Sequence, residues 1–269
     1  MAPTKRTRRR ISSTSSPPNT VAKKISKVPQ AASSFPICSL LSDLVLEILA
    51  CVSASSLRDL FSAKLSCKLF KKIAQEDYIY RKISLDDFFV VDIYLNAEAT
   101  SFFNRCLECG NLEALYQQGL FEYFTDHRRK QSGLALLEKA ANSSHLGASY
   151  VLGITLICSG DENAQRAGLE LVANIKTSLQ MQECRKKLAK SAGSLWKPRD
   201  VDFLKPKLLT CPFPDRKRSS WHLVGEENGY DHLHCESCIL NREIIHVCRM
   251  LSGVPLNSYH YRMCLSSDN

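Results

Sequence analysis

Two cysteines near the C-terminus, Cys235 and Cys238, stand three residues apart in a Cys-x-x-Cys knuckle. Such a knuckle places two thiolates on one tight turn, at the separation that a tetrahedral zinc ion needs. Further cysteines lie upstream at Cys211 and downstream at Cys248 and Cys264. The chemistry that this pattern favours is structural zinc binding, and the alternative is a set of reduced cysteines in a small irregular segment.

The third and fourth zinc ligands have to come from elements around this knuckle. The residues that follow it form an apolar stripe at helical spacing: Ile244, Val247, Cys248 and Leu251. Cys248 is therefore expected to face inward, as a third ligand arriving from a helix would. Cys211 is the preferred fourth ligand, with His234 or His222 as substitutes, whereas His246 lies off the stripe. The predicted metal set is Cys211, Cys235, Cys238 and Cys248.

Catalytic chemistry finds little support in the sequence. It contains no glycine-rich phosphate loop, no Gly-x-Ser-x-Gly elbow and no His-Glu-x-x-His motif. A RING-type module would need two metal sites with paired, interleaved ligands, and a redox role for Cys235 and Cys238 lacks a thioredoxin-like βαβ pattern around them. We therefore predict that the chain is not an enzyme.

Residues 35–83 carry a strongly patterned trio of short helices. The first has an apolar face formed by Leu44, Val45, Ile48, Leu49 and Val52. The sequence from Ser56 to Asp59 has the form of a capping box and opens a second helix, and Leu69 to Ile73 predict a third. Three helices this short cannot bury all their apolar side chains among themselves, so a partner is expected.

This pattern resembles the F-box, most closely that of small plant F-box proteins with tetratricopeptide-like repeats. The resemblance rests on Glu47-Ile48-Leu49, on Ser56-Leu57 and on the run from Ser66 to Phe70. One departure is that the family's usual Leu-Pro is Leu41-Ser42 here. The resemblance implies binding to a Skp-type adaptor, and through it to a cullin, by these residues: Leu41, Leu44, Val45, Ile48, Leu49, Leu57 and Leu60. Some of them must instead form the core of the F-box, and the sequence does not sort them.

The middle of the chain contains a repeat. The segment 111–119 aligns with 145–153 at an offset of 34 residues, and 133–137 aligns with 168–172 at an offset of 35. This period predicts helix–turn–helix repeats of tetratricopeptide type, and the details resemble the Sel-like subclass. Small residues permit close helix packing, while two tyrosines fill the interface. The segment 179–188 is expected to end the solenoid as a helix with a polar outer face: Lys186, Lys187 and Lys190.

The net charge of +9 is concentrated in the first 34 residues, which hold eight basic and no acidic side chains. The rest of the chain has 28 basic and 27 acidic residues, so no strong field for phosphate binding is expected. The tail is poor in apolar residues and is expected to be disordered. The run from Lys5 to Arg10 is either a nuclear-import signal or a solvated basic tail. No apolar run reaches the length of a membrane span, so we expect a soluble protein in the nucleus, the cytoplasm or both.

Together these patterns predict a mainly α protein: a basic tail (1–34), an F-box (35–83), a connecting segment (84–98), a short α-solenoid (99–192) and a small, irregular Cys/His-rich module (193–269). The predicted function is that of a substrate-recognition subunit of a Skp–cullin–F-box ubiquitin ligase, binding a protein substrate through the repeats and the C-terminal module. The alternatives are a helical-repeat scaffold and a nucleic-acid-associated zinc protein.

Overall fold

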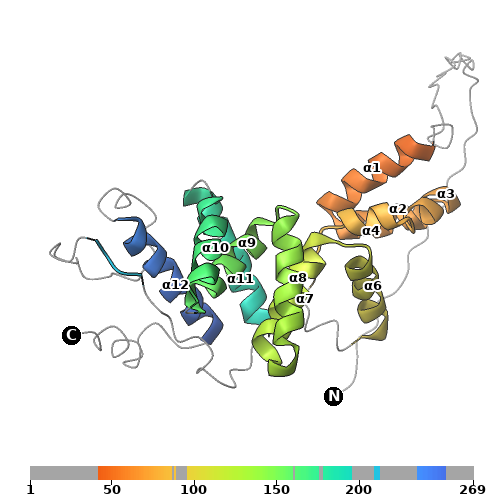
Figure 1. Cartoon of the computed structure of the whole chain (residues 1–269). Coiled ribbons are helices and arrows are strands. Elements are labelled where there is room, and N and C mark those ends of the chain that lie inside the picture. The colour runs from red at the N-terminus through yellow and green to blue at the C-terminus, as the bar shows by residue number, and fades with distance from the viewer. Residues whose placement is uncertain are drawn as a thin grey trace, which may run out of the picture. The chain divides into compact units, whose positions relative to one another are not determined.

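The computed structural model describes residues 42–86, 88, 96–159, 161–175, 178–195, 209–212 and 235–252. These residues all belong to one compact unit, Leu40–Asn269. Within these ranges the regular structure is helical and contains no strand (Figure 1). The predicted basic tail, most of the connecting segment after Leu85 and much of the predicted C-terminal module lie outside the described residues. The prediction of a mainly α fold is confirmed.

Four short helices come first: α1 (Ser42–Ser55), α2 (Leu57–Ser66), α3 (Lys68–Ile73) and α4 (Asp77–Lys82). The predicted cap is present, since the Ser56 hydroxyl accepts a 3.2 Å hydrogen bond from the Asp59 amide. The thiol of Cys67 caps α3 in the same way, accepting from the Phe70 amide. Helix α1 packs against α2, α3 and α4.

The core of these helices continues into the next part of the chain. Helix α6 (Ala97–Glu108) adds Phe103 and Cys106 to it, and the start of α7 (Leu112–Thr125) adds Ala114. Asn111, only 2% exposed, fixes the junction. Its side-chain amide donates to the carbonyl oxygens of Tyr80 and Ile83 at 2.9 and 2.8 Å, while its side-chain oxygen accepts from two amides that begin α7. The end of α4 is thereby tied to the first repeat helix.

Two helical hairpins form the repeats: α7 with α8 (Lys130–Asn142), and α9 (Leu146–Cys158) with α10 (Glu162–Ala173). A 3₁₀ turn at His127–Arg129 links the first pair. The two helices of each hairpin meet at glycines that are equivalent in the two repeats. A Cβ on Gly119 would lie 3.1 Å from the carbonyl oxygen of Gly133, and one on Gly153 would lie 2.9 Å from that of Gly168. The spacing found in the sequence is therefore a real structural repeat.

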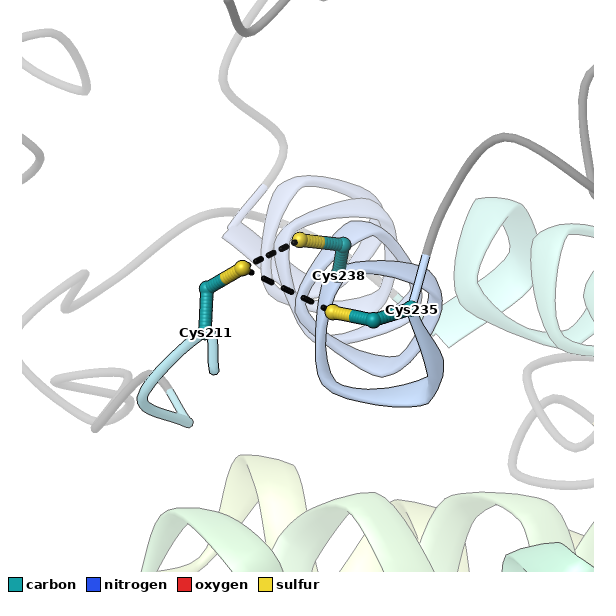
Figure 2. Close-up of side chains that lie close together, drawn as sticks. All are labelled: Cys211, Cys235 and Cys238. Carbon is teal, nitrogen blue, oxygen red and sulfur yellow. Dashed lines mark hydrogen bonds between the residues drawn. The ribbon is translucent and has the colours of Figure 1, made fainter. Parts of the chain in front are cut away.

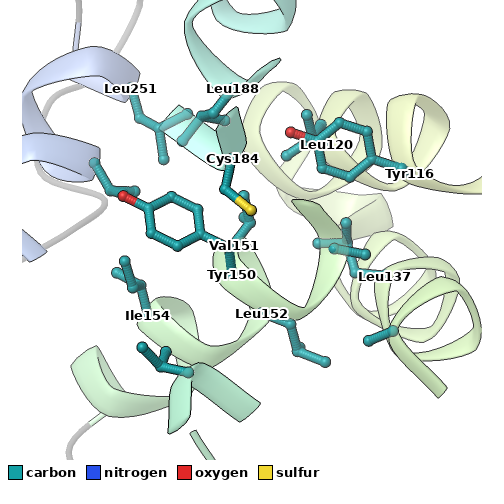
Figure 3. Close-up of a cluster of buried hydrophobic side chains, with 14 of the residues drawn as sticks. Tyr116, Leu120, Leu137, Tyr150, Val151, Leu152, Ile154, Cys184, Leu188 and Leu251 are labelled. Atoms are coloured by element: carbon teal, nitrogen blue, oxygen red, sulfur yellow. The ribbon is translucent and has the colours of Figure 1, made fainter. Parts of the chain in front are cut away.

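The interior of the solenoid is filled as the repeat predicted. Tyr116 and Tyr150 occupy equivalent positions in α7 and α9, and both are fully buried. Helix α11 (Ser178–Leu195) packs on α9 and α7 and contributes Cys184 and Leu188 to the same core (Figure 3). The predicted polar outer face of this helix is only partly correct. Lys187 is half-buried, forms an ion pair with Glu113 and lies over the Tyr116 ring.

The last described helix, α12 (Glu236–Ser252), packs against α9 and α11. Its apolar stripe joins the solenoid core, and Leu251 lies in the cluster drawn in Figure 3. Glu243 of α12 is buried, and its carboxylate accepts hydrogen bonds from the Tyr150 hydroxyl at 2.8 Å and from the Arg185 guanidinium at 2.8 and 2.6 Å. Helix α12 therefore shares one core with the repeats, and a buried charged network orients it there.

Candidate functional site

Two features of the described chain are suited to binding: exposed apolar side chains on the first two helices, and a cluster of thiols beside α12. On α1 the pair Leu44 and Ile48 is 50% and 44% exposed, and on α2 the pair Phe61 and Leu65 is 43% and 88% exposed. Each pair is spaced by four residues, so its members share one side of their helix. Water-exposed apolar side chains on such short helices are the surplus surface that the sequence analysis expected.

The structure sorts the residues that were predicted to bind an adaptor. Val45, Leu49 and Leu60 are at most 2% exposed and belong to the core of the helices themselves. Leu57 is half-buried against that core, and Leu41 lies outside the described residues. Leu44 and Ile48 are the members of the predicted set that face solvent. Phe61 and Leu65 were not among the predicted binding residues, although their apolar character at four-residue spacing could have indicated them.

The thiol cluster brings together three of the four cysteines that were predicted as metal ligands. The sulfur of Cys211 lies 3.6 Å from that of Cys235 and 3.5 Å from that of Cys238 (Figure 2). All three sulfurs lie within 4.8 Å of one another. A tetrahedral zinc ion with Zn–S bonds of about 2.3 Å holds its thiolates about 3.8 Å apart. The spacing therefore suits a single metal ion, whereas it is too long for a disulfide, in which the sulfurs are about 2.05 Å apart.

Two local structures place these thiols. Cys235 stands immediately before α12, and its carbonyl accepts from the Ile239 amide, so the knuckle forms the first turn of the helix. Cys211 lies on a separate segment, 209–212, which the side chain of Asn241 holds. The Asn241 oxygen accepts from the Leu209 amide at 2.7 Å, and its nitrogen donates to the Leu209 carbonyl at 2.8 Å. This paired contact fixes the backbone two residues before Cys211.

The electrostatic setting differs among the three thiols. The pKa of Cys235 lies below its usual value, chiefly because the backbone N–H of Cys238 donates to its sulfur. Burial raises the pKa of Cys238 to about 12, and its hydrogen bonds to the other two thiols act in the same direction. All three side chains are half-buried, so the cluster is sheltered but accessible from solvent.

Cys248, the fourth predicted ligand, is not part of the cluster. It does face inward, but it is 1% exposed in the solenoid core, where it shares a hydrogen bond with Cys158 that raises the pKa of the Cys158 thiol. The inward stripe of α12 thus reflects core packing. His222 and His234 lie outside the described residues, and His246 is half-buried on α12.

A second Cys-x-x-Cys, formed by Cys106 and Cys109 at the end of α6, is not part of such a cluster either. Cys106 is fully buried, and burial raises the pKa of its thiol to about 12. Within the part of the chain that the structure describes, Cys211, Cys235 and Cys238 are the group of three ligand side chains close enough to share an ion. The contact of Asn241 with Leu209 was not predicted, because an asparagine inside a helix has no local signal for a partner 32 residues away.

The fold and these sites define a class: a bundle of short N-terminal helices followed by a solenoid of repeated helical hairpins. Residues 86–192 match the family described as plant tetratricopeptide repeats. The chain is 31% identical to a putative F-box protein of Arabidopsis thaliana over 210 residues, which cover 72% of this chain and 70% of the relative. The chain belongs to the F-box protein family, as its resemblance predicted.

Two further F-box proteins of Arabidopsis thaliana match more narrowly. One is 29% identical over 57% of this chain and 42% of its own length, and the other is 27% identical over 42% and 34%, respectively. No solved structure matches the chain. None of the helices in the described ranges combines the length and apolar character that crossing a membrane requires.

Proposed function

We propose that this chain is the substrate-recognition subunit of a Skp–cullin–F-box ubiquitin ligase. The observation that carries the proposal is the set of exposed apolar side chains on α1 and α2, in a chain that belongs to the F-box protein family. In this account Leu44, Ile48, Phe61 and Leu65 contact a Skp-type adaptor, which connects the chain to a cullin.

Docking of these four side chains would be driven by the removal of their apolar surface from water. Fully burying one leucine, isoleucine or phenylalanine side chain contributes about 1.5–3 kcal/mol. The four side chains begin between 43% and 88% exposed, so each has only part of that contribution left to gain. Their combined burial of several kcal/mol supports docking, from which the cost of association must be subtracted. The core residues Val45, Leu49 and Leu60 support this surface without touching the partner.

The second part of the proposal concerns the repeats and α12, to which the substrate would bind. Solenoids of stacked helical hairpins present extended surfaces to peptides and proteins. The substrate, a protein, would bind to the repeats and the C-terminal region and would thereby be held near the ligase's ubiquitin-charged partner. Catalysis would belong to other subunits, while this chain supplies proximity. The same proposal places the protein in the nucleus, the cytoplasm or both.

The test is co-purification with a plant Skp-type adaptor, using single charged substitutions at exposed sites. Ile48→Asp and Leu65→Asp each place a carboxylate on the proposed contact surface. Both positions are exposed, so the fold should tolerate the changes, which circular dichroism would verify. Leu179→Asp is the matched control, because Leu179 is 62% exposed on α11.

We expect both F-box variants to lose the adaptor while the Leu179→Asp variant retains it. Retention of the adaptor by folded Ile48→Asp and Leu65→Asp variants would refute this placement of the interface. If the unmodified chain bound no adaptor, the helical-repeat scaffold would become the better account of the protein.

A further inference from the structure

The thiol cluster carries an inference that is independent of any ligase partner. We infer that Cys211, Cys235 and Cys238 are ligands of a structural zinc ion, which fastens the segment 209–212 to the start of α12. Three sulfurs converge from two segments that are 24 residues apart in the sequence, at spacings of 3.5 and 3.6 Å for the two pairs that involve Cys211. Thiolates at these spacings match the donor type and the geometry that zinc prefers.

Contacts outside the thiol cluster hold the three cysteines in this geometry. Asn241 binds both backbone groups of Leu209, and Glu243, two residues further along α12, is fixed by Tyr150 and Arg185. Asn241 of α12 thus holds the Cys211 segment, and the buried carboxylate of Glu243 holds the same helix on the solenoid. Outer contacts of this kind orient ligands before the metal arrives and reduce the entropy lost on binding.

Reduced thiols joined only by sulfur–sulfur hydrogen bonds are the competing explanation. Such bonds are weak, and they give no reason for an amide clamp that brings a third cysteine from another segment to a Cys-x-x-Cys turn. A metal ion gives that reason, because its binding energy becomes folding energy for the segments that it joins. Structural zinc sites are four-coordinate, so one further ligand completes the site.

The experiment measures metal content in the tag-free full chain, purified under reducing conditions without chelator. We expect about one zinc ion per chain by mass spectrometry of the metal. Replacing it with Co²⁺ should give a thiolate-to-cobalt charge-transfer band and the intense d–d bands of a tetrahedral site. Cys211→Ser and Cys238→Ser should each lose both the zinc and the charge-transfer intensity. Cys51→Ser, which changes an exposed cysteine on α1, is the matched control and should keep them.

A second readout tests the structural role. Removing zinc with a chelator should lower the unfolding temperature of the unmodified chain and leave that of Cys238→Ser unchanged, since the variant has no metal to lose. The inference is overturned if the purified chain neither contains nor takes up zinc, or if Cys238→Ser retains a full complement of the metal. A disulfide between any two of the three cysteines in the protein as isolated from cells would overturn it as well.

Discussion

At the scale of single residues, the solenoid depends on a few buried charges that bridge helices far apart in sequence. Glu243 is the clearest case, because its carboxylate is almost fully buried and is bonded by Tyr150 and Arg185. Losing one partner of a buried ion pair costs about 3–5 kcal/mol, since the other charge is left without compensation. Arg185 is 28% exposed and can recover some hydration. These contacts make Glu243 the main polar anchor of α12.

We therefore expect Glu243→Gln to lower the free energy of unfolding by about 2–3 kcal/mol, measured by urea denaturation. The matched control is Glu138→Gln, because Glu138 is exposed on α8 and its change should stay within about 0.5 kcal/mol. Equal stability of the Glu243→Gln variant and the unmodified chain would show that this network does not hold α12 in place.

Glu113 gives a prediction for pH. Burial raises the pKa of its carboxyl, but the hydrogen bond from His145 and the charge of Lys187 outweigh burial, so the pKa lies below the usual value of 4.5. A carboxyl with a lowered pKa in the folded state stabilises the protein above its unfolded pKa, and this contribution disappears as the pH falls through the folded pKa. The stabilisation from Glu113 should therefore be complete at neutral pH and decline below about pH 4.5.

The measurement is the free energy of unfolding of the unmodified chain and of Glu113→Gln, from pH 7 down through the range in which the Glu113 carboxyl becomes protonated. The variant should be less stable at neutral pH and should lose stability less steeply in acid. Parallel pH profiles for the two proteins would contradict the assignment of this ion pair.

At the scale of elements, the two hairpins owe their geometry to glycines that stand inside helices. A Cβ on Gly133 would overlap the backbone nitrogen of Tyr123, and one on Gly168 would lie 2.5 Å from the carbonyl oxygen of Gly153. Both obstacles are backbone atoms, which cannot move aside as a flexible side chain can. The helices of each hairpin approach this closely only because the side chain is absent.

Gly133→Ala and Gly168→Ala should each destabilise the protein by about 1–3 kcal/mol, although alanine is the better helix former. Gly193→Ala on α11 is the control, since a Cβ there has nothing within 4 Å and should stabilise the helix by up to about 1 kcal/mol. Thermal unfolding of the three variants checks the order. Stabilisation by alanine at Gly168 would mean that the hairpin is not packed this tightly.

Local sequence rules predicted these elements well. The cap at Ser56 depends on neighbouring residues, and the repeat shows itself as a 34-residue period, so both could be predicted from the sequence. The exposure of Ile48 and the burial of Leu49 could not be predicted in this way, because they depend on which side of α1 meets α4 and the core. Cys248 shows the same limit: the stripe correctly predicted its inward direction, but that direction leads to Cys158 rather than to the other thiols.

At the scale of the whole molecule, the described helices form one continuous path of packing from α1 to α12. The first helices leave apolar side chains exposed while burying a core that continues, through Asn111, into the repeats. The repeats in turn share their core with α12. A protein docked on α1 and α2 would thus be mechanically connected to whatever the solenoid binds. That connection is what a substrate receptor requires.

Asn111 offers a test of this connection. Asn111→Ala removes the cap of α7 and both hydrogen bonds to the end of α4, leaving the part-buried carbonyl of Tyr80 and the buried carbonyl of Ile83 without this donor. We expect a loss of about 2–4 kcal/mol in stability, because caps contribute about 1 kcal/mol and unsatisfied buried groups cost about 1–3 kcal/mol. Asn96→Ala, which removes only the exposed cap of α6, should cost about 1 kcal/mol. Equal losses at the two positions would mean that Asn111 is a cap and not a tether.

The measurement that tests the central claim most directly is co-purification of the full chain with a plant Skp-type adaptor. The account predicts a stable complex that the folded Ile48→Asp variant cannot form and the Leu179→Asp variant can. A folded, unmodified chain that binds no such adaptor, or an Ile48→Asp variant that binds as well as the unmodified chain, would contradict it.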